Sequence, residues 1–191
     1  TTVQSQSQSQ SEVPDVHNVN ILDGSGSMAG SKYVNACAGI RLDFQTCKNE
    51  GFKSFTFVEF NNDSPIEITT HCFMESFDNV RLKFNGAHSG TPLYYTVYTT
   101  LERLLKEVPK TDKVLVKIFT DGQDTMYGRG QKSKPEELKA LIATCESRGF
   151  TITFIGTKND TQFVVNNLNI NLSNTLVHDN TGEGIKMSFQ T

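Results

Sequence analysis

Short apolar runs alternate with longer amphipathic stretches along most of this 191-residue chain. The short runs are rich in Val, Ile, Leu and Phe, as strands are, and they cover residues 16–22, 53–60, 113–120 and 150–155. The longer stretches repeat apolar side chains every three or four positions, as helices do, and they cover residues 31–50, 90–108 and 133–148. Strands that alternate with helices predict an α/β fold, a doubly wound and mostly parallel sheet with helices on both faces.

Weaker patterns complete the predicted sheet. The turn-forming residues 61–65 indicate a hairpin, so residues 66–70 should form an antiparallel edge strand. Residues 175–178 are expected to form the last short strand, which gives six strands in all. The other expected elements are a short helix or loop around residues 76–82 and short helices at 160–168 and 181–190.

The length suits one domain, which we place at residues 13–191. Residues 1–12 alternate Gln with Ser, and we expect them to form a disordered arm. The pattern leaves open whether that arm has no function or serves as a tether for assembly.

Composition excludes several classes of protein. A net charge of -3 argues against a nucleic-acid partner, because nucleic-acid-binding surfaces are usually basic. No apolar stretch approaches the roughly 20 residues that span a bilayer, so we expect no membrane association and no signal peptide. Cys37 and Cys47 lie on the apolar face of a predicted helix and are expected to be buried thiols. A cytoplasmic protein, or one inside a phage-infected cell or virion, is the resulting expectation.

The segment from Asp23 to Met28, Asp-Gly-Ser-Gly-Ser-Met, joins the first predicted strand to the first helix. It places one carboxylate and two hydroxyls at the carboxyl end of a strand, where open α/β sheets bind their ligands. Thr91 precedes another helix, and Asp121 directly follows the strand at 113–120. Oxygen donors of these types suit Mg²⁺, Mn²⁺ or Ca²⁺.

This set resembles the metal-ion-dependent adhesion site (MIDAS) of the von Willebrand factor A (vWA) domain, in which Asp-x-Ser-x-Ser is followed by a distant Thr and Asp. The resemblance covers roughly residues 15–190 and is to the small stand-alone type found in bacteria and their phages. It implies a metal site formed by Asp23, Ser25, Ser27, Thr91 and Asp121. It also implies a bound Mg²⁺, with Mn²⁺ or Ca²⁺ possible, that captures an Asp or Glu of a protein partner. The implied function is adhesion or assembly without enzymatic activity.

Other functions make different demands on the same segment. A phosphate-binding loop would require a Gly-Lys-Ser/Thr ending, and a dinucleotide site would require a third Gly where Ala29 stands. A metal-assisted hydrolase or phosphotransferase stays open as an alternative, although Ser25 has no identified base. The second alternative is a structural assembly subunit whose metal only stabilises the loops.

Several polar residues near the motif could either support the site or have ordinary structural roles. The basic loop at 125–134 either steers an acidic partner or is an ordinary solvated loop, and its cations are Arg129, Lys132 and Lys134. His88 is expected to be a plain loop histidine, and Asp124 either supports the metal site or caps a turn. Asn20 and Lys117 interrupt predicted strands, so we expect their polar groups to be satisfied or exposed at an edge.

Overall fold

The computed structural model describes most of the predicted domain. The described residues are 14–61, 68–121, 124–125, 135–156, 158, 162, 165, 166, 168 and 174–177, with only the backbone given at 68–72. The predicted N-terminal arm, the cations of the basic loop and the predicted helix at 181–190 lie outside these residues.

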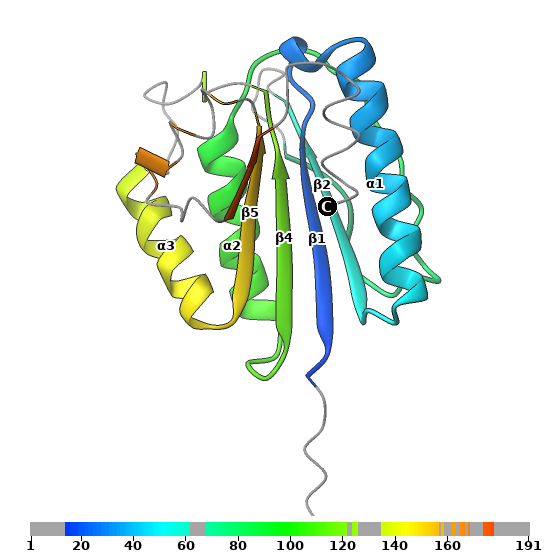
Figure 1. Cartoon of the computed structure of the whole chain (residues 1–191), viewed down its shortest axis with the longest axis vertical. Helices are drawn as coiled ribbons and strands as arrows, with labels where there is room; N and C mark the ends of the chain where they lie inside the picture. Colours follow the sequence, from blue (N-terminus) through cyan, green and yellow to red (C-terminus); the bar gives the residue numbers. More distant parts are fainter. Residues whose placement is uncertain are drawn as a thin grey trace, which may run out of the picture.

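Six strands form one sheet in the order β3-β2-β1-β4-β5-β6, with β1 and β4 at its centre (Figure 1). Their bounds are Val16–Asp23 (β1), Ser54–Phe60 (β2), Ile68–Glu75 (β3), Lys113–Phe119 (β4), Phe150–Gly156 (β5) and Thr175–Val177 (β6). Every neighbouring pair is parallel except β2 and β3, which are antiparallel. The predicted α/β fold, with a mostly parallel six-stranded sheet and one antiparallel edge strand, is therefore confirmed.

Helices cover both faces of this sheet, with α1 on one side and α2 and α3 on the other (Figure 1). Their bounds are Ser31–Asn49 (α1), Leu93–Glu107 (α2) and Pro135–Ser147 (α3), and a 3₁₀ turn, η1, spans Gly26–Met28. The predicted apolar stripe of α1 packs on the sheet, with Cys37, Ile40 and Cys47 buried. The stripe of α2 is buried on the opposite face, as predicted.

The edge of the sheet differs from the sequence prediction. Strand β3 runs to Glu75, five residues beyond the predicted end. Residues 76–89 form a loop, one of the two alternatives predicted for the stretch around residues 76–82. The backbone of Phe55 pairs with that of Glu75, and the Met74 amide donates to the Thr56 hydroxyl at 3.0 Å. The free edge of β2 requires partners for its backbone groups along its whole length, and the short apolar run at 66–70 did not reveal that demand.

Two polar side chains of β1 are buried beneath α1. Asn18 and Asn20 are fully buried, and their Nδ2 atoms donate to the Asp43 carboxylate at 2.9 and 2.8 Å. The Lys117 ammonium donates to the same carboxylate at 2.5 Å. Among the described residues, neither asparagine Oδ1 atom has a hydrogen-bond partner, so the prediction that the polar groups of Asn20 are satisfied or edge-exposed does not hold for its Oδ1 atom. These bonds fix α1 to the two central strands.

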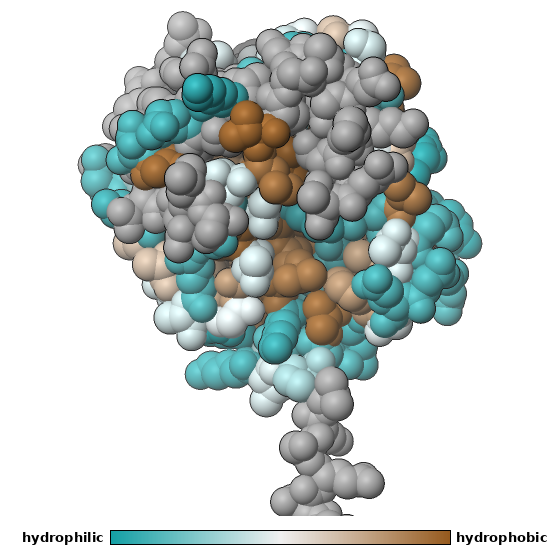
Figure 2. All heavy atoms as spheres, in the orientation of Figure 1, coloured by the Kyte–Doolittle hydropathy of each residue, from teal (hydrophilic) through white to brown (hydrophobic). Residues whose placement is uncertain are grey.

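The face seen in Figure 2 carries apolar side chains in its middle, over the strands, with hydrophilic side chains around them. Strands β1 and β2 are buried along almost their whole length, as is usual for parallel strands that are covered on both faces. None of the described helices is long and apolar enough to cross a membrane.

Candidate metal centre

The turn after β1 is held tightly between two neighbouring segments. The Gly24 amide donates to the Phe60 carbonyl at 2.7 Å, and the Gly24 carbonyl accepts from the His88 amide at 2.8 Å. A Cβ atom at Gly24 would lie 3.0 Å from Oε1 of Glu59 and 3.1 Å from the Phe60 carbonyl oxygen. Glycine is therefore required here for close approach of the backbone to β2.

Asp23 ends β1 with its carboxylate fully buried. One oxygen accepts from the Ser25 amide at 2.8 Å, and the other accepts from the Thr120 hydroxyl at 2.7 Å. Burial raises the pKa of this carboxyl from 3.8 to about 6, and the nearby Asp121 adds to the rise, although the bonds from Ser25 and Thr120 oppose it. A buried carboxylate whose pKa stays raised despite these hydrogen bonds favours an incoming cation.

The two serines of the turn connect Asp23 to the end of β4. The hydroxyl oxygens of Ser25 and Ser27 lie 3.1 Å apart, and the Ser27 hydroxyl donates to Oδ1 of Asp121 at 2.7 Å. Oδ2 of Asp121 forms an ion pair with the ammonium of Lys32, which also donates to the Ser27 carbonyl at 3.0 Å. Four of the five predicted ligands are thus joined by direct contacts.

Thr91 is the fifth predicted ligand, and its segment lies beside the turn because the Gly26 amide donates to the Ser89 carbonyl at 2.9 Å. The Thr91 side chain is buried, and its amide and carbonyl both bond to Thr125, at 2.8 and 3.1 Å. Within the described part of the chain, no hydrogen bond joins the Thr91 hydroxyl to the other four ligands.

These residues fit a hard divalent cation. They offer two carboxylates and three neutral hydroxyls, and a cation, the Lys32 ammonium, already contacts one of the carboxylates. The 3.1 Å separation of the serine oxygens is close to the roughly 2.9 Å between adjacent ligands around Mg²⁺, whose bonds are about 2.0–2.1 Å. No group of three or more His, Cys, Asp or Glu side chains suited to a metal occurs among the described residues, so the hydroxyls are essential to the donor set.

The structure gives the residues near the site more ordinary roles. Oδ2 of Asp124 accepts from the Tyr94 amide at 2.7 Å, which caps the first turn of α2 and favours the capping interpretation. His88 is exposed, and its Nδ1 lies 3.0 Å from the Gly86 carbonyl oxygen, as expected for a loop histidine.

Sequence analysis missed Lys32 as a member of the site. The available signal was its position, because a lysine in the first turn of α1 faces the positive end of the helix dipole. A lysine there is stabilised by a nearby anion, and Asp121 provides one only after the chain has folded.

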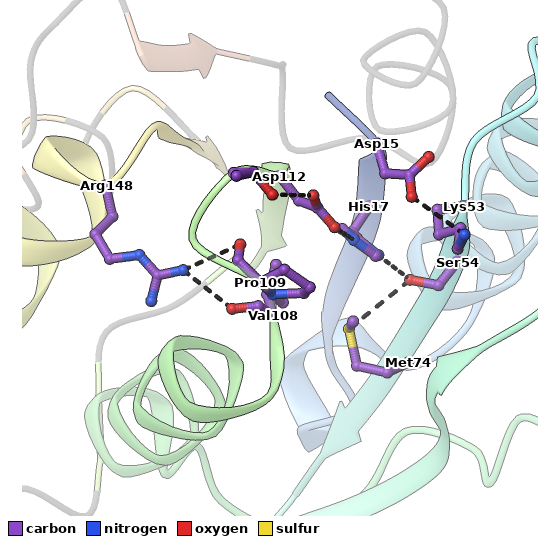
Figure 3. A network of polar contacts seen from close by, with 10 residues as sticks. Asp15, His17, Lys53, Ser54, Met74, Val108, Pro109, Asp112 and Arg148 are labelled. Carbon is purple, nitrogen blue, oxygen red and sulfur yellow. Dashed lines mark hydrogen bonds and ion pairs between the residues drawn. The ribbon is translucent and has the colours of Figure 1, made fainter. Parts of the chain in front are cut away.

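A second polar cluster lies at the opposite end of β1 (Figure 3). Nδ1 of His17 lies 2.6 Å from the Ser54 hydroxyl, and Nε2 lies 2.9 Å from Oδ2 of Asp112. His17 and Ser54 are each 3% exposed, so no substrate reaches the serine despite the Ser-His-Asp combination. The hydrogen bond from His17 lowers the pKa of Asp112. This cluster links β1, β2 and the turn before β4, and both ring nitrogens of its histidine are engaged by Ser54 and Asp112.

No protein-family model matches the sequence, and no curated protein matches it significantly. Solved structures do match. The manganese-loaded TRAP protein of Plasmodium vivax is 13% identical with a TM-score of 0.60, covering 93% of this chain and 72% of that one. The pilus adhesin SpaC of Lactobacillus rhamnosus GG is 12% identical with a TM-score of 0.70, covering 95% of this chain and 30% of that one.

A von Willebrand factor type A protein of Catenulispora acidiphila is 16% identical with a TM-score of 0.60. The match covers 93% of this chain and 41% of that one, so the present chain spans less than half of this protein and of the adhesin. The likeness establishes that the chain has the fold of a vWA domain.

Proposed function

We propose that this vWA-fold domain is a protein-interaction module without enzymatic activity, in which a divalent cation captures an acidic side chain of a partner. The residues that would hold the cation are Asp23, Ser25, Ser27, Thr91 and Asp121. Mg²⁺ is the expected ion, with Mn²⁺ or Ca²⁺ as alternatives, and when bound it would supply a coordination position for a carboxylate.

The observation that carries this proposal is the convergence of oxygen donors from separate segments. The hydroxyls of Ser25 and Ser27 lie 3.1 Å apart, and Ser27 lies 2.7 Å from a carboxylate that is 94 positions away in sequence. The carboxylates of Asp23 and Asp121 are almost completely inaccessible to solvent, and only that of Asp121 has a compensating cation among the described residues, so the charge of Asp23 is unfavourable. A divalent cation would neutralise both carboxylates. Because its other protein ligands would be neutral hydroxyls, it would still attract a carboxylate from a partner.

Two structural neighbours support an interaction role. One is a pilus adhesin, and another contains manganese. Both have the same fold, and in the present chain Asp23 and Asp121 lie at the carboxyl ends of its two central strands.

The geometry gives little support to hydrolysis or phosphoryl transfer. Among the described residues no histidine contacts Ser25, whose hydroxyl lies beside that of Ser27. The Ser-His-Asp combination of this chain is buried at the other end of β1. A serine nucleophile requires an accessible oxygen with an adjacent free base. Ser27 is exposed, but the carboxylate beside it, that of Asp121, is already paired with Lys32 and is weakened as a base.

The proposed setting is the cytoplasm or another reducing compartment. Cys37, Cys47 and Cys145 are free and buried, and burial raises the pKa of each thiol to about 12. Inert, buried thiols of this kind are consistent with a protein that does not depend on disulfides.

Calorimetric titration with Mg²⁺ and Mn²⁺ tests the metal site directly. We expect the wild type to bind one ion and Asp121→Ala to bind at least tenfold more weakly. The matched control is Asp78→Ala, which removes the same charge from an exposed position.

Capture of the partner side chain is tested with immobilised peptides that contain Asp or Glu, compared with the same peptides containing Asn or Gln. Retention that requires the carboxylate and disappears with EDTA supports the proposal. Equal retention with EDTA, or equal retention of the amide peptides, would show that the domain binds through another surface. If Asp23→Ala only lowers thermal stability and leaves capture intact, the metal has the structural role instead.

A further inference from the structure

Lys32 holds an unusual position in the candidate metal centre. It is the second residue of α1, and its ammonium pairs with Oδ2 of Asp121 while donating to the Ser27 carbonyl at 3.0 Å. The Asp121 side chain is 1% exposed and that of Lys32 is 21% exposed, so the pair is largely shielded from solvent. A shielded pair is screened weakly by salt and affects nearby charges strongly.

This position is unfavourable for the helix itself. The amino terminus of α1 carries the positive end of the helix dipole, its first turn contains no acidic side chain, and Gly30 provides no side-chain cap. Asp121 compensates Lys32 from a distance of 89 positions in sequence. The charge of Lys32 is thus stabilised by Asp121 of the candidate metal site, whereas the helix dipole of α1 is unfavourable to it.

The two carboxylates of the site differ in how their charge is compensated. Asp121 is paired with Lys32, whereas Asp23 has hydrogen-bond donors but no ion pair with any described cation. Counted over Asp23, Asp121 and Lys32 alone, the described part of the site therefore carries about one net negative charge when no metal is bound. Without Lys32 these residues would carry two negative charges, and a divalent cation would not be repelled by an ammonium group next to Asp121.

We propose that Lys32 is a built-in counter-ion that keeps the site assembled without metal and sets its metal affinity low, so that the ion exchanges. The inference rests on the proposed function, because it assumes that Asp23 and Asp121 hold the divalent ion. Lys32 acts through Asp121 and is a positioning residue. Its charge opposes the incoming ion, and its bonds to Asp121 and Ser27 hold the end of β4 against the turn after β1.

The experiment compares Lys32→Gln, which keeps a hydrogen-bond donor and removes the charge, with Lys32→Arg, which keeps the charge. The matched control is Lys48→Gln, which changes the net charge equally on the same helix but at an exposed pair with Asp78. Titrations with Mn²⁺ at low salt give the metal affinity, and thermal melting with and without Mn²⁺ gives the shift in melting temperature.

We expect Lys32→Gln to bind Mn²⁺ at least tenfold more tightly than the wild type. Its melting temperature should be several degrees lower in EDTA and should recover with Mn²⁺. Lys32→Arg and Lys48→Gln should stay within about threefold of the wild-type affinity. If Lys32→Gln proves too unstable in EDTA, Lys32→Arg remains decisive, because a tenfold change despite the retained charge would overturn the inference.

Equal or weaker Mn²⁺ binding by Lys32→Gln, with the wild type still binding, would overturn this inference and leave the proposed function intact. If neither the wild type nor any of the variants binds Mn²⁺, the proposed function fails and this inference fails with it.

Discussion

The two ends of β1 carry polar clusters of similar composition and opposite character. At the amino end, His17 connects Ser54 with Asp112 through bonds of 2.6 and 2.9 Å (Figure 3). At the carboxyl end, Asp23 and the following turn meet Asp121, and Lys32 provides the compensating cation. Both clusters join β1 to its neighbours in the sheet, and both are largely buried.

The difference between them lies in how completely charge and hydrogen bonding are satisfied. The amino-end carboxylate is stabilised, because its pKa is lowered by His17. The carboxyl-end carboxylate of Asp23 is destabilised by burial, which raises its pKa to about 6. A satisfied cluster contributes to stability, whereas a cluster with uncompensated charge is available to bind a ligand. The polar composition of the two ends does not by itself distinguish these roles.

The largest effect is expected for His17→Ala. Removing the imidazole leaves the Ser54 hydroxyl and the Asp112 carboxylate without their shared partner and creates a cavity, which should cost about 3 kcal/mol of unfolding free energy. Urea unfolding measures the loss, and metal affinity should not change. The exposed His88 provides the control, because His88→Ala should cost less than about 0.5 kcal/mol. A loss below about 1 kcal/mol for His17→Ala would show that the cluster is not structural.

The pH dependence of stability should have opposite sign at the two ends. In EDTA, the raised pKa of Asp23 means that the folded protein binds a proton more tightly than the unfolded chain. The stability from this proton is present below pH 3.8 and is lost as pH rises through about 6, a change of about 3 kcal/mol. The unfolding free energy of Asp23→Asn should therefore increase relative to that of the wild type between pH 4 and pH 7. Urea unfolding at each pH measures this difference.

Asp112→Asn is the control at the other end. Because the pKa of Asp112 is lowered, its stabilisation is present above its ordinary pKa of 3.8 and is lost as pH falls below that value. The variant should be less stable than the wild type at neutral pH and should approach it in acid. A constant gap for Asp23→Asn across this range would contradict the assigned burial of Asp23.

Gly24→Ala should have an intermediate effect of about 2 kcal/mol, because its Cβ would press on the carbonyl of Phe60 at 3.1 Å. Thermal melting detects the loss, and metal affinity should fall as the turn shifts. Gly26→Ala is matched to it, since its Cβ would lie 3.5 Å from the Ser89 carbonyl oxygen, an ordinary contact. Equal melting temperatures for the two variants would show that the turn is not tightly held.

Ser27→Ala should have the smallest effect on stability, about 1 kcal/mol, because Ser27 is exposed and loses only its hydroxyl contacts with Asp121 and Ser25. Its metal affinity should nevertheless fall at least tenfold. Ser54→Ala provides the comparison at the amino end, where stability should fall with no change in Mn²⁺ titrations. If Ser27→Ala binds Mn²⁺ as the wild type does, Ser27 is not a ligand.

Much of the fold could be predicted from local patterns. The alternation of apolar runs and amphipathic stretches predicted the parallel sheet, and the stripe through Cys37, Ile40 and Cys47 predicted the buried face of α1. The edge was predicted less well, because the extension of β3 to Glu75 depends on pairing with β2 and not on its own sequence.

The candidate site shows the same division. The resemblance to the vWA motif predicted a cation site at Asp23, Ser25, Ser27, Thr91 and Asp121, and contacts among four of these residues are present in the structure. The buried Asp43 beneath β1 was not predicted, since its partners Asn18 and Asn20 come from a different element.

The sequence by itself determined the layering of strands and helices, because that depends on residue type and short spacing, and its resemblance to the vWA motif supplied the proposed set of oxygen donors. Only the tertiary structure decided which charges meet. Lys32 pairs with Asp121 across 89 positions, and Asp23 is left with donors from Ser25 and Thr120 but no ion pair among the described residues. Electrostatic energy depends on distance and burial in three dimensions, and neither is encoded in the local order of residues.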